Sequence, residues 1–256
     1  MDQQPAHSVM FISPIRRALL LFCLCTSVAI HAGTTAEAPP LHQSVYSVKK
    51  FGTTLGEMTN QFHRQQDKLH YTSSLKASGL AALFISEPIT EHSLLRQSES
   101  GAMQQLAYTL NNPQKKRKNE SISFSWSASG EAQIRAAYRN KDETIRTTSD
   151  TFSRQLLPLL MSRDLLQNST QKQNQFQIVE KARLEHYSYQ RLNEETLRYN
   201  NENLNTLKFR IDKQNSDSYS YVWLAKATDY LPLKIDQYKG DDLQASLLLT
   251  HYTRTQ

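Results

Sequence analysis

The chain has 256 residues with 30 basic and 24 acidic side chains, so its net charge of +6 is a mild excess for this length. Such a balance does not indicate a nucleic-acid-binding protein, and we expect no nucleic acid among its partners. Hydrophobic residues make up 38% of the chain, which is enough to build one sizeable core.

The N-terminal segment, residues 1–32, has the layout of a secretory signal peptide. Arg16 and Arg17 precede the apolar run Ala18–Ile30, and the small residues Ala32 and Gly33 follow it. As a helix this run would reach only about 20 Å, whereas the hydrocarbon core of a membrane is about 30 Å thick, so an uncleaved anchor is the weaker alternative. We predict cleavage after Ala32 and a periplasmic mature protein without a transmembrane span.

Both cysteines, Cys23 and Cys25, lie inside this segment. The residues before them, Phe22 and Leu24, are larger than the small residue that an acylation signal requires, which argues against a lipoprotein. The mature chain would contain no cysteine, and this excludes disulfides, a thiolate nucleophile and cysteine-ligated metal centres. We predict a flexible tether over 33–43 and a single β-rich domain over 44–254.

Alternation of apolar and polar residues predicts β-strands along most of the mature chain. A first hairpin is expected from Val45–Phe51 and Glu57–Arg64, joined by the turn Gly52–Gly56. Short turns separate the later segments, which favours a meander, and the predicted fold is mainly β, a large antiparallel curved sheet or barrel. The other expected strands are Lys68–Lys76, Pro88–Leu95, Met103–Leu110, Ile122–Trp126, Ile134–Tyr138, Phe176–Glu180, Leu184–Leu192, Glu195–Tyr199, Leu204–Ile211 and Leu243–His251.

Two helical segments interrupt the strands. Ser78–Phe84 is rich in helix formers and is predicted to be a short helical cap that closes one end of the barrel. Thr151–Gln167 is predicted to be a helix with Asp150 as its N-cap, packed across the sheet by an apolar stripe. Pro158 should bend it, because a proline in a helix interior costs roughly 3 kcal/mol unless a kink absorbs it. The stripe consists of Phe152, Leu156, Leu159 and Leu160.

The basic run Lys115–Lys118 lies between two expected strands and is predicted to be a hairpin tip. A solvated turn that resists aggregation is the simplest interpretation. Contact with an anionic lipid surface is an alternative.

The segment from Tyr219 to Tyr238 is predicted to be a hairpin with its turn at Ala225–Asp229. The side chains of Tyr219, Tyr221 and Trp223 fall at a spacing of two and share one face of the first strand. Val222 and Leu224 take the other face.

Several of these segments resemble the bacterial exported proteins grouped as domain of unknown function 3108. The resemblance rests on YSVKKFGTTLG at Tyr46–Gly56, SGLAALF at Ser78–Phe84, the helix after Asp150 and WLAKATDYLPLKI at Trp223–Ile235. It implies export and a β-rich fold, and it supplies no catalytic residues. One departure is Asn203–Asn205, where related sequences often place a glycine at a tip.

No motif of a known catalytic or metal site is present. The chain has no H-E-x-x-H pair, no G-x-S-x-G elbow and no phosphate-binding loop. His63 and His70 are expected on different strands and are predicted to be surface or core histidines. We therefore predict no catalytic residues, no metal ligands and no cofactor, although a carboxylate pair is neither shown nor excluded.

Aromatic residues suggest a site for an apolar ligand. Tyr187 and Tyr189 share a strand face, as do Tyr219, Tyr221 and Trp223, and a curved sheet lined in this way could hold such a ligand. The alternative is that these rings form the core beneath the helix. Two functions stay open: a non-enzymatic periplasmic envelope protein that binds a hydrophobic small molecule or an envelope partner, and an envelope hydrolase with an unrecognised site.

Overall fold

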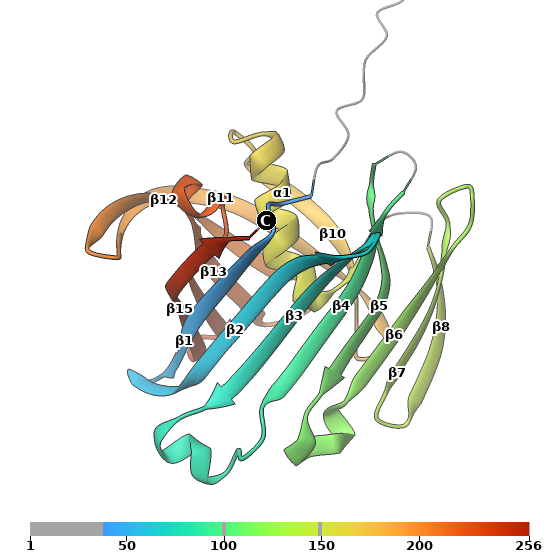
Figure 1. Ribbon diagram of the computed structural model, residues 1–256, viewed down its shortest axis with the longest axis horizontal. Coiled ribbons are helices and arrows are strands. Elements are labelled where there is room, and N and C mark those ends of the chain that lie inside the picture. The colour runs from blue at the N-terminus through green and yellow to red at the C-terminus, as the bar shows by residue number, and fades with distance from the viewer. Residues whose placement is uncertain (1–37, 99–100, 148–149, 256) are drawn as a thin grey trace, which may run out of the picture. The chain divides into compact units, whose positions relative to one another are not determined.

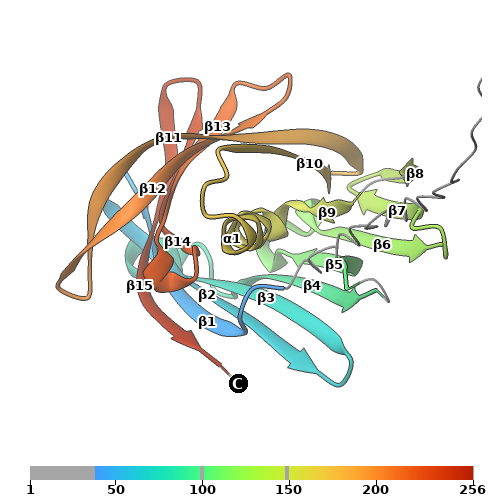
Figure 2. The same cartoon turned by 90° about the horizontal axis from the view of Figure 1, so that it is seen from above.

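The computed structural model describes residues 38–98, 101–147 and 150–255. In this part of the chain fifteen strands form one sheet that curls around one α-helix, as Figures 1 and 2 show. The predicted barrel-like antiparallel fold is thereby confirmed. The strands are β1 (His42–Lys50), β2 (Thr53–Gln65), β3 (Lys68–Ala77), β4 (Ile89–Gln97), β5 (Met103–Asn111), β6 (Glu120–Trp126), β7 (Ala132–Tyr138), β8 (Lys141–Thr147), β9 (Thr151–Ser153), β10 (Gln173–Glu180), β11 (Arg183–Tyr199), β12 (Glu202–Lys213), β13 (Ser218–Leu224), β14 (Pro232–Lys239) and β15 (Asp242–Arg254).

The sheet consists of two meanders. Consecutive strands pair from β1 to β8 and again from β10 to β15, while β9 runs parallel to β10. β1 pairs antiparallel with β15, so the two ends of the domain meet in the middle of the sheet. Because turns alternate between the two ends of a meander, the β1–β2, β3–β4, β5–β6, β10–β11, β12–β13 and β14–β15 turns share one end, named the lower end after its place in Figure 1.

Local sequence explains two of the hairpins. At Gly56 of β2 a Cβ atom would lie 2.4 Å from the carbonyl oxygen of Lys76 in β3, so only glycine allows the two strands to approach this closely. The β11–β12 tip is formed by Asn200 and Asn201 with φ of 48° and 65°, as a two-residue hairpin turn requires. The tip expected at Asn203–Asn205 is wrong, because these residues lie within β12.

The two edges of the sheet overlap and are not paired strand to strand. The pairing order places β8 at one edge and β9 at the other. Phe124 and Ile134, from the inward face of β6 and β7, pack against Val179 and Ala182 at the end of β10. The hydroxyl of Thr147 also donates to Oε1 of Gln177 at 2.8 Å. Side-chain packing and hydrogen bonds therefore complete the barrel here.

A buried amide fastens β9 in place, and we call this group the Gln105 latch. Nε2 of Gln105 donates to the hydroxyls of Ser93 and Ser153, each at 2.9 Å. Its Oε1 accepts from the backbone N–H of Ser153 at 2.6 Å. Since Gln105 is fully buried, each of these groups would be left without water if the latch were removed.

The helix α1 (Leu157–Gln167) lies inside the curve of the sheet, as Figure 2 shows. It follows the short 3₁₀ helix η3 (Arg154–Leu156). Leu156, Leu159 and Leu160 are fully buried among core residues that include Phe62 and Phe209, which confirms the predicted apolar stripe. The helix thus fills the upper half of the barrel.

The predicted start of the helix is wrong. Thr151–Ser153 forms β9 instead, because these residues gain hydrogen bonds to β10 and to the latch. The N-cap position is Leu156, and Asp150 has no capping role. Pro158 lies in the first turn of α1, where its missing N–H costs nothing, and the junction between η3 and α1 takes the place of the expected bend.

The predicted cap forms a helix but closes nothing. Residues Gly79–Leu83 form the 3₁₀ helix η1 in the β3–β4 connection, and none of them is buried. A second 3₁₀ helix, η2 (Pro113–Lys118), carries the basic run in the β5–β6 turn, as predicted for a hairpin tip. A third, η4 (Lys226–Thr228), lies in the β13–β14 turn.

Other boundaries differ in smaller ways. β1 begins at His42, so the last two residues of the predicted tether belong to a strand. β8 was not predicted, because its exposed residues do not alternate, and Leu184–Leu192 and Glu195–Tyr199 merge into the single strand β11. The predicted signal peptide lies outside the described residues and stays a prediction.

Candidate functional site: a cavity below the helix

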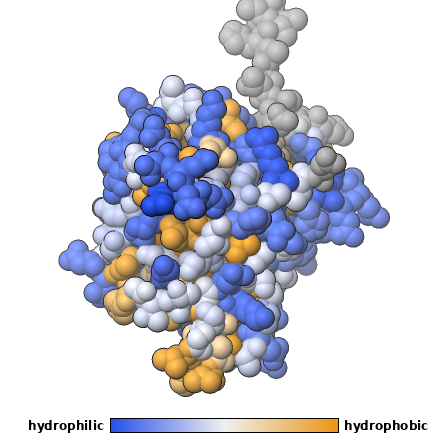
Figure 3. Space-filling model, turned by 60° about the vertical axis from the view of Figure 1, so that its left-hand side comes forward, coloured by the Kyte–Doolittle hydropathy of each residue, from blue (hydrophilic) through white to orange (hydrophobic). Residues whose placement is uncertain are grey.

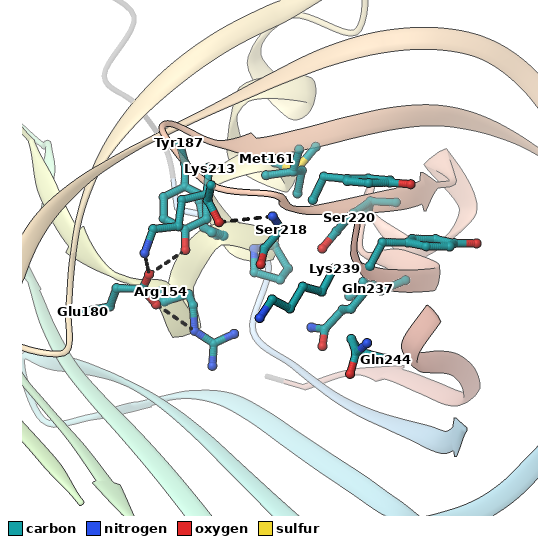
Figure 4. A pocket seen from close by; sticks show the side chains of 18 of the residues that line it. Arg154, Met161, Glu180, Tyr187, Lys213, Ser218, Ser220, Gln237, Lys239 and Gln244 are labelled. Atoms are coloured by element: carbon teal, nitrogen blue, oxygen red, sulfur yellow. Dashed lines mark hydrogen bonds and ion pairs between the residues drawn. The ribbon is translucent and has the colours of Figure 1, made fainter. Parts of the chain in front are cut away.

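Below the N-terminal turn of α1 the barrel contains a pocket of about 430 Å³, shown in Figure 4. It extends from the helix to residues at the lower end, the turn residues Lys181 and Ser216 and the last residue of β14, Lys239, and so it opens at that end. Its wall is formed by the inward faces of β11–β14. The apolar lining residues are Leu157, Pro158, Met161, Ile211, Val222 and Ile235.

A second pocket of about 280 Å³ adjoins the first on the side of β1–β3 and β15. The two pockets share four lining residues, Arg154, Pro158, Ile235 and Gln237, so they are two arms of one cavity. The second arm is mostly apolar. Its apolar lining is Tyr46, Val48, Met58, Tyr71, Leu75, Leu231, Ala245 and Leu247.

The inward-facing residues change character along the strands. On β13, Leu224 and Val222 are buried beneath the helix, whereas Ser220 borders the pocket further down. The same change occurs on β10, where Ile178 is core and Glu180 is charged. Polar side chains do not fill a core without partners, and the lower half of the barrel is therefore hollow on this side.

Charged residues gather along one side of the first arm. Nε of Arg154 lies 3.5 Å from a carboxylate oxygen of Glu180, whose other oxygen accepts from the Tyr187 hydroxyl at 2.8 Å. Lys213 also bonds to Glu180 and lies 3.2 Å from Glu185. Figure 4 shows Arg154, Glu180, Tyr187 and Lys213 on one side of the pocket, with Gln237 and Gln244 across from them.

Protonation in this cluster follows from burial and charge. Burial alone would raise the pKa of Glu180, but the hydrogen bond from Lys213 and the charge of Arg154 outweigh it and hold the pKa below its ordinary value. Burial raises the pKa of Tyr187, so its hydroxyl stays neutral and donates to Glu180. The Arg154 side chain is 47% exposed, and it makes its ion pair through Nε, which leaves the Nη groups directed to the cavity space.

The predicted site residues divide between the two faces of the sheet. Tyr187 faces inward and lines the first arm. Tyr189 also faces inward, but it is 2% exposed, packs edge-on against Phe209 and donates to Asp164 at 3.0 Å, so it belongs to the core.

Tyr219, Tyr221 and Trp223 share the opposite face of β13, as their spacing predicts, and this is the outward face because Val222 and Leu224 belong to the core. Tyr219 stacks on Tyr238 at 5.1 Å between ring centroids and borders the mouth of the first arm. Tyr221 does not line either arm.

Trp223 is held on the outward face by charged neighbours. Its Nε1 donates to Glu195 at 2.6 Å, and Lys208 and Lys234 lie 4.8 and 4.5 Å from its ring centroid. Hydrogen bonds from Lys208 and Trp223 lower the pKa of Glu195 to about 2. This arrangement is a cation–π cluster on the outside of the barrel, which we call the outer cluster.

Sequence reasoning missed Arg154, Glu180 and Lys213. Arg154 was hidden inside the predicted helix, and no motif marks the other two. The strand sequences contained a pattern that could have identified Glu180 and Lys213. On one face of each strand, two apolar residues are followed by a charged one: Phe176, Ile178 and Glu180 in β10, and Phe209, Ile211 and Lys213 in β12.

His63, His70 and His92 form a stacked row across β2, β3 and β4, with centroid distances of 5.2 Å. Within the described residues, no group of three His, Cys, Asp or Glu side chains is arranged to hold a metal ion. The same part of the chain contains no helix of the length and apolarity that a membrane span needs.

The fold and cavity define a class: barrel-like β-proteins in which a helix fills one half of the interior and a hollow occupies the other. The sequence matches the model of a protein family of unknown function, DUF3108, over residues 44–241. The chain belongs to this family, as the resemblance of its motifs indicated. A comparison with curated proteins finds no match.

One solved structure supports the fold, and two others have lower similarity. A β-barrel-like protein of the DUF1849 family from Brucella abortus is similar with a TM-score of 0.55 at 10% identity, covering 85% of this chain and 99% of its own. A Bacteroides fragilis protein described as exported, with a YmcC-like fold, has a TM-score of 0.35 at 8% identity, covering 85% and 96%. A DUF1329 family protein from Desulfovibrio piger has a TM-score of 0.25 at 11% identity, covering 86% and 87%.

Proposed function

We propose that this protein is a non-enzymatic periplasmic binding protein for an amphiphile, whose apolar chain occupies the cavity below α1. The single observation that carries the proposal is the pairing of an apolar arm with a charged arm around Arg154. The predicted signal peptide at residues 1–32 supports the periplasmic location.

The apolar arm suits a hydrocarbon chain. Tyr46, Met58 and Leu247 are among the apolar side chains that line it. Pockets for small ligands measure about 300–1,000 Å³, a range that includes the first arm alone. Each methylene moved from water into such a site contributes about 0.8 kcal/mol, so roughly ten would support micromolar affinity after the cost of association.

The charged arm suits the polar end of the same molecule. Arg154 stands where the two arms join, and its guanidinium presents donors to the cavity beyond its ion pair with Glu180. A carboxylate or another hydrogen-bond acceptor placed there would gain charge-assisted bonds. A fatty acid or a related acyl compound fits this chemistry.

Titration with a fluorescent fatty acid tests the proposal. In Ser220→Trp an indole enters the first arm from β13, and we expect binding to weaken by at least about tenfold because the space is filled. Tyr221→Trp is the matched control, since it places an indole on the neighbouring residue that faces outward. Saturable binding that is equal in both variants, or absent in the native protein, contradicts the proposal.

The role of Arg154 is tested with two ligands of equal chain length. Arg154→Met should weaken binding of a fatty acid more than binding of the corresponding fatty alcohol, because only the acid loses an ionic partner. Equal losses would mean that Arg154 only shapes the cavity. N-terminal sequencing of the periplasmic protein tests the location, with Gly33 expected as the first residue.

A further inference from the structure

The lower end of the barrel carries an exposed apolar group, which we call the apolar tip. It consists of Phe51 in the β1–β2 turn and of Leu80, Leu83 and Phe84 in and beside η1. These side chains are 78%, 79%, 76% and 82% exposed. In the described part of the chain they are the four most exposed large apolar side chains, since the remaining three are 38–47% exposed.

The backbone fixes the tip in this position. The N–H of Ser78, just before η1, donates to the carbonyl of Leu55 in β2 at 2.9 Å. Gly56 brings β2 against Lys76 and Ala77 at the same level. The β1–β2 turn and η1 therefore project from the same end of the sheet as neighbouring turns (Figure 1), and Figure 3 shows an apolar projection at the bottom of the molecule.

Exposure of this kind indicates a partner. Single apolar side chains on a surface are ordinary, but four on adjoining projections form a surface that water solvates poorly. Leu80, Leu83 and Phe84 cover no core, because no residue of η1 is buried. Within the described residues nothing covers them, so a partner is the means by which they would leave water.

Charge identifies the partner. Seven cationic side chains surround the tip or lie on the next turn at the same end, while Glu57 and Glu87 are the carboxylates on the elements beside the tip. Among the described residues none of the seven has a carboxylate within ion-pair distance in the structure. They are Lys49, Lys50, Lys76, Lys115, Lys116, Arg117 and Lys118.

We propose that the lower end docks on an anionic phospholipid membrane. Phe51, Leu80, Leu83 and Phe84 enter the boundary between headgroups and acyl chains, and the cations of η2 contact the anionic headgroups. Apolar side chains that project from turns, with lysines on the neighbouring elements, match the chemistry of this interface. Docking places the mouth of the cavity, at the same end, against the lipid surface.

Cosedimentation of the mature protein with vesicles tests the docking. We use phosphatidylcholine vesicles with and without phosphatidylglycerol, and expect binding that rises with phosphatidylglycerol and falls with salt. Leu80→Ser/Phe84→Ser should weaken partitioning by at least about tenfold, because two large apolar groups no longer leave water. The matched control is Leu192→Ser, because Leu192 is an exposed residue of β11 away from the tip, and this variant should bind as the native protein does.

A second variant separates charge from apolar insertion. Lys116→Gln/Arg117→Gln should lose about fivefold in binding per charge removed, only on vesicles with phosphatidylglycerol. Both variants should keep a native melting temperature, since all four positions are exposed.

Three outcomes would overturn the proposal. These are absence of binding to every vesicle, binding by the tip variant equal to that of the native protein, and self-association in solution that the tip variant abolishes while no vesicle is bound. The last outcome would assign the tip to a contact between protein copies. Fatty-acid titration of the same variants without vesicles tests ligand binding independently of membrane docking. If docking fails, the affinity for the fatty acid should still be unchanged.

Discussion

The upper and lower halves of this barrel are built from the same strands but hold different contents. In the upper half the inward side chains Val222, Leu224 and Phe209 are buried against α1. In the lower half the same strands present Ser220 and Lys213 to a cavity. One strand can therefore contribute to a core over part of its length and line a cavity over the rest, while its side chains keep alternating between the inward and outward faces.

The position of α1 decides where the change occurs. The helix begins at Leu157, halfway along the interior, and its buried apolar residues pack against the sheet. Below that point no element of the described part of the chain fills the interior, so polar inward residues can be hydrated. Stability should therefore depend on the upper half and ligand binding on the lower half.

Removing packing from the upper half should give the largest effect. Leu160→Ala leaves a cavity beside a fully buried position and should lower the free energy of unfolding by about 2–5 kcal/mol. Leu166→Ala on the same helix is the control, because Leu166 is 41% exposed. Urea unfolding measures both, and equal midpoints would show that the helix is peripheral to stability.

Breaking the Gln105 latch should have the next largest effect. Gln105→Ala leaves the N–H of Ser153 without a partner in a buried site, at about 1–3 kcal/mol for an unsatisfied group, while the Ser93 hydroxyl keeps its bond to Gln155. Gln133→Ala, on the exposed side of β7, should change little. Faster hydrogen exchange of β9 alone would show that the latch holds the edge locally, and unchanged exchange would argue that β9 needs no latch.

As the pH falls, stability should be lost first through a group in the upper half and then through a group in the lower half. Burial lowers the pKa of His42, in the upper half, below 6.5, although the Pro40 carbonyl and Asp229 oppose this. Below pH 6.5 His42 binds a proton more readily in the unfolded chain than in the folded one, so the stability falls as the pH drops below 6.5. Glu180, in the lower half, has a lowered pKa, and its contribution is present above 4.5 and is lost as pH falls further.

Variants separate these two steps. His42→Asn should flatten part of the loss of melting temperature below pH 6.5, and His70 and His92, whose pKa values are also lowered by burial, account for the remainder. Glu180→Gln should reduce the pH dependence only below 4.5, and Asp229 and Glu195, whose pKa values are also lowered, keep the rest of it. A native pH profile in both variants would contradict the assignment.

The outer cluster should give the smallest effect. Trp223→Phe loses the bond to Glu195 and part of the cation–π contact, at about 1 kcal/mol in stability. Because Trp223 faces away from the cavity, its replacement should leave fatty-acid affinity unchanged. A loss of affinity would show that the outward face takes part in binding.

Much of the fold could be predicted from the sequence because two-residue alternation is a local property. Most strands of both meanders carry it, and the family motifs agree with it. The helix start could not be predicted this way, since Thr151–Ser153 becomes a strand only through pairing with β10 and bonding to Gln105. β8 was missed because its residues are exposed and do not alternate.

The candidate site was less predictable, for a different reason. Parity shows which residues share a face but not which face is inward, and the rings of Tyr221 and Trp223 suggested an interior that proved to be the outside. Burial of Val222 and Leu224 decides the question, and it depends on where α1 lies. Binding by Tyr187, Tyr189, Tyr219, Tyr221 and Trp223 stays a prediction for the titrations above.

The pairing of β1 with β15 has a consequence for the order of folding. Each meander consists of neighbours in sequence, so its hairpins can form early and locally. The joint between them pairs His42 with Arg254, and it cannot form until the final strand is available. The barrel therefore closes last at the centre of its sheet, and a chain that ends before β15 would leave two unpaired strand edges open to aggregation.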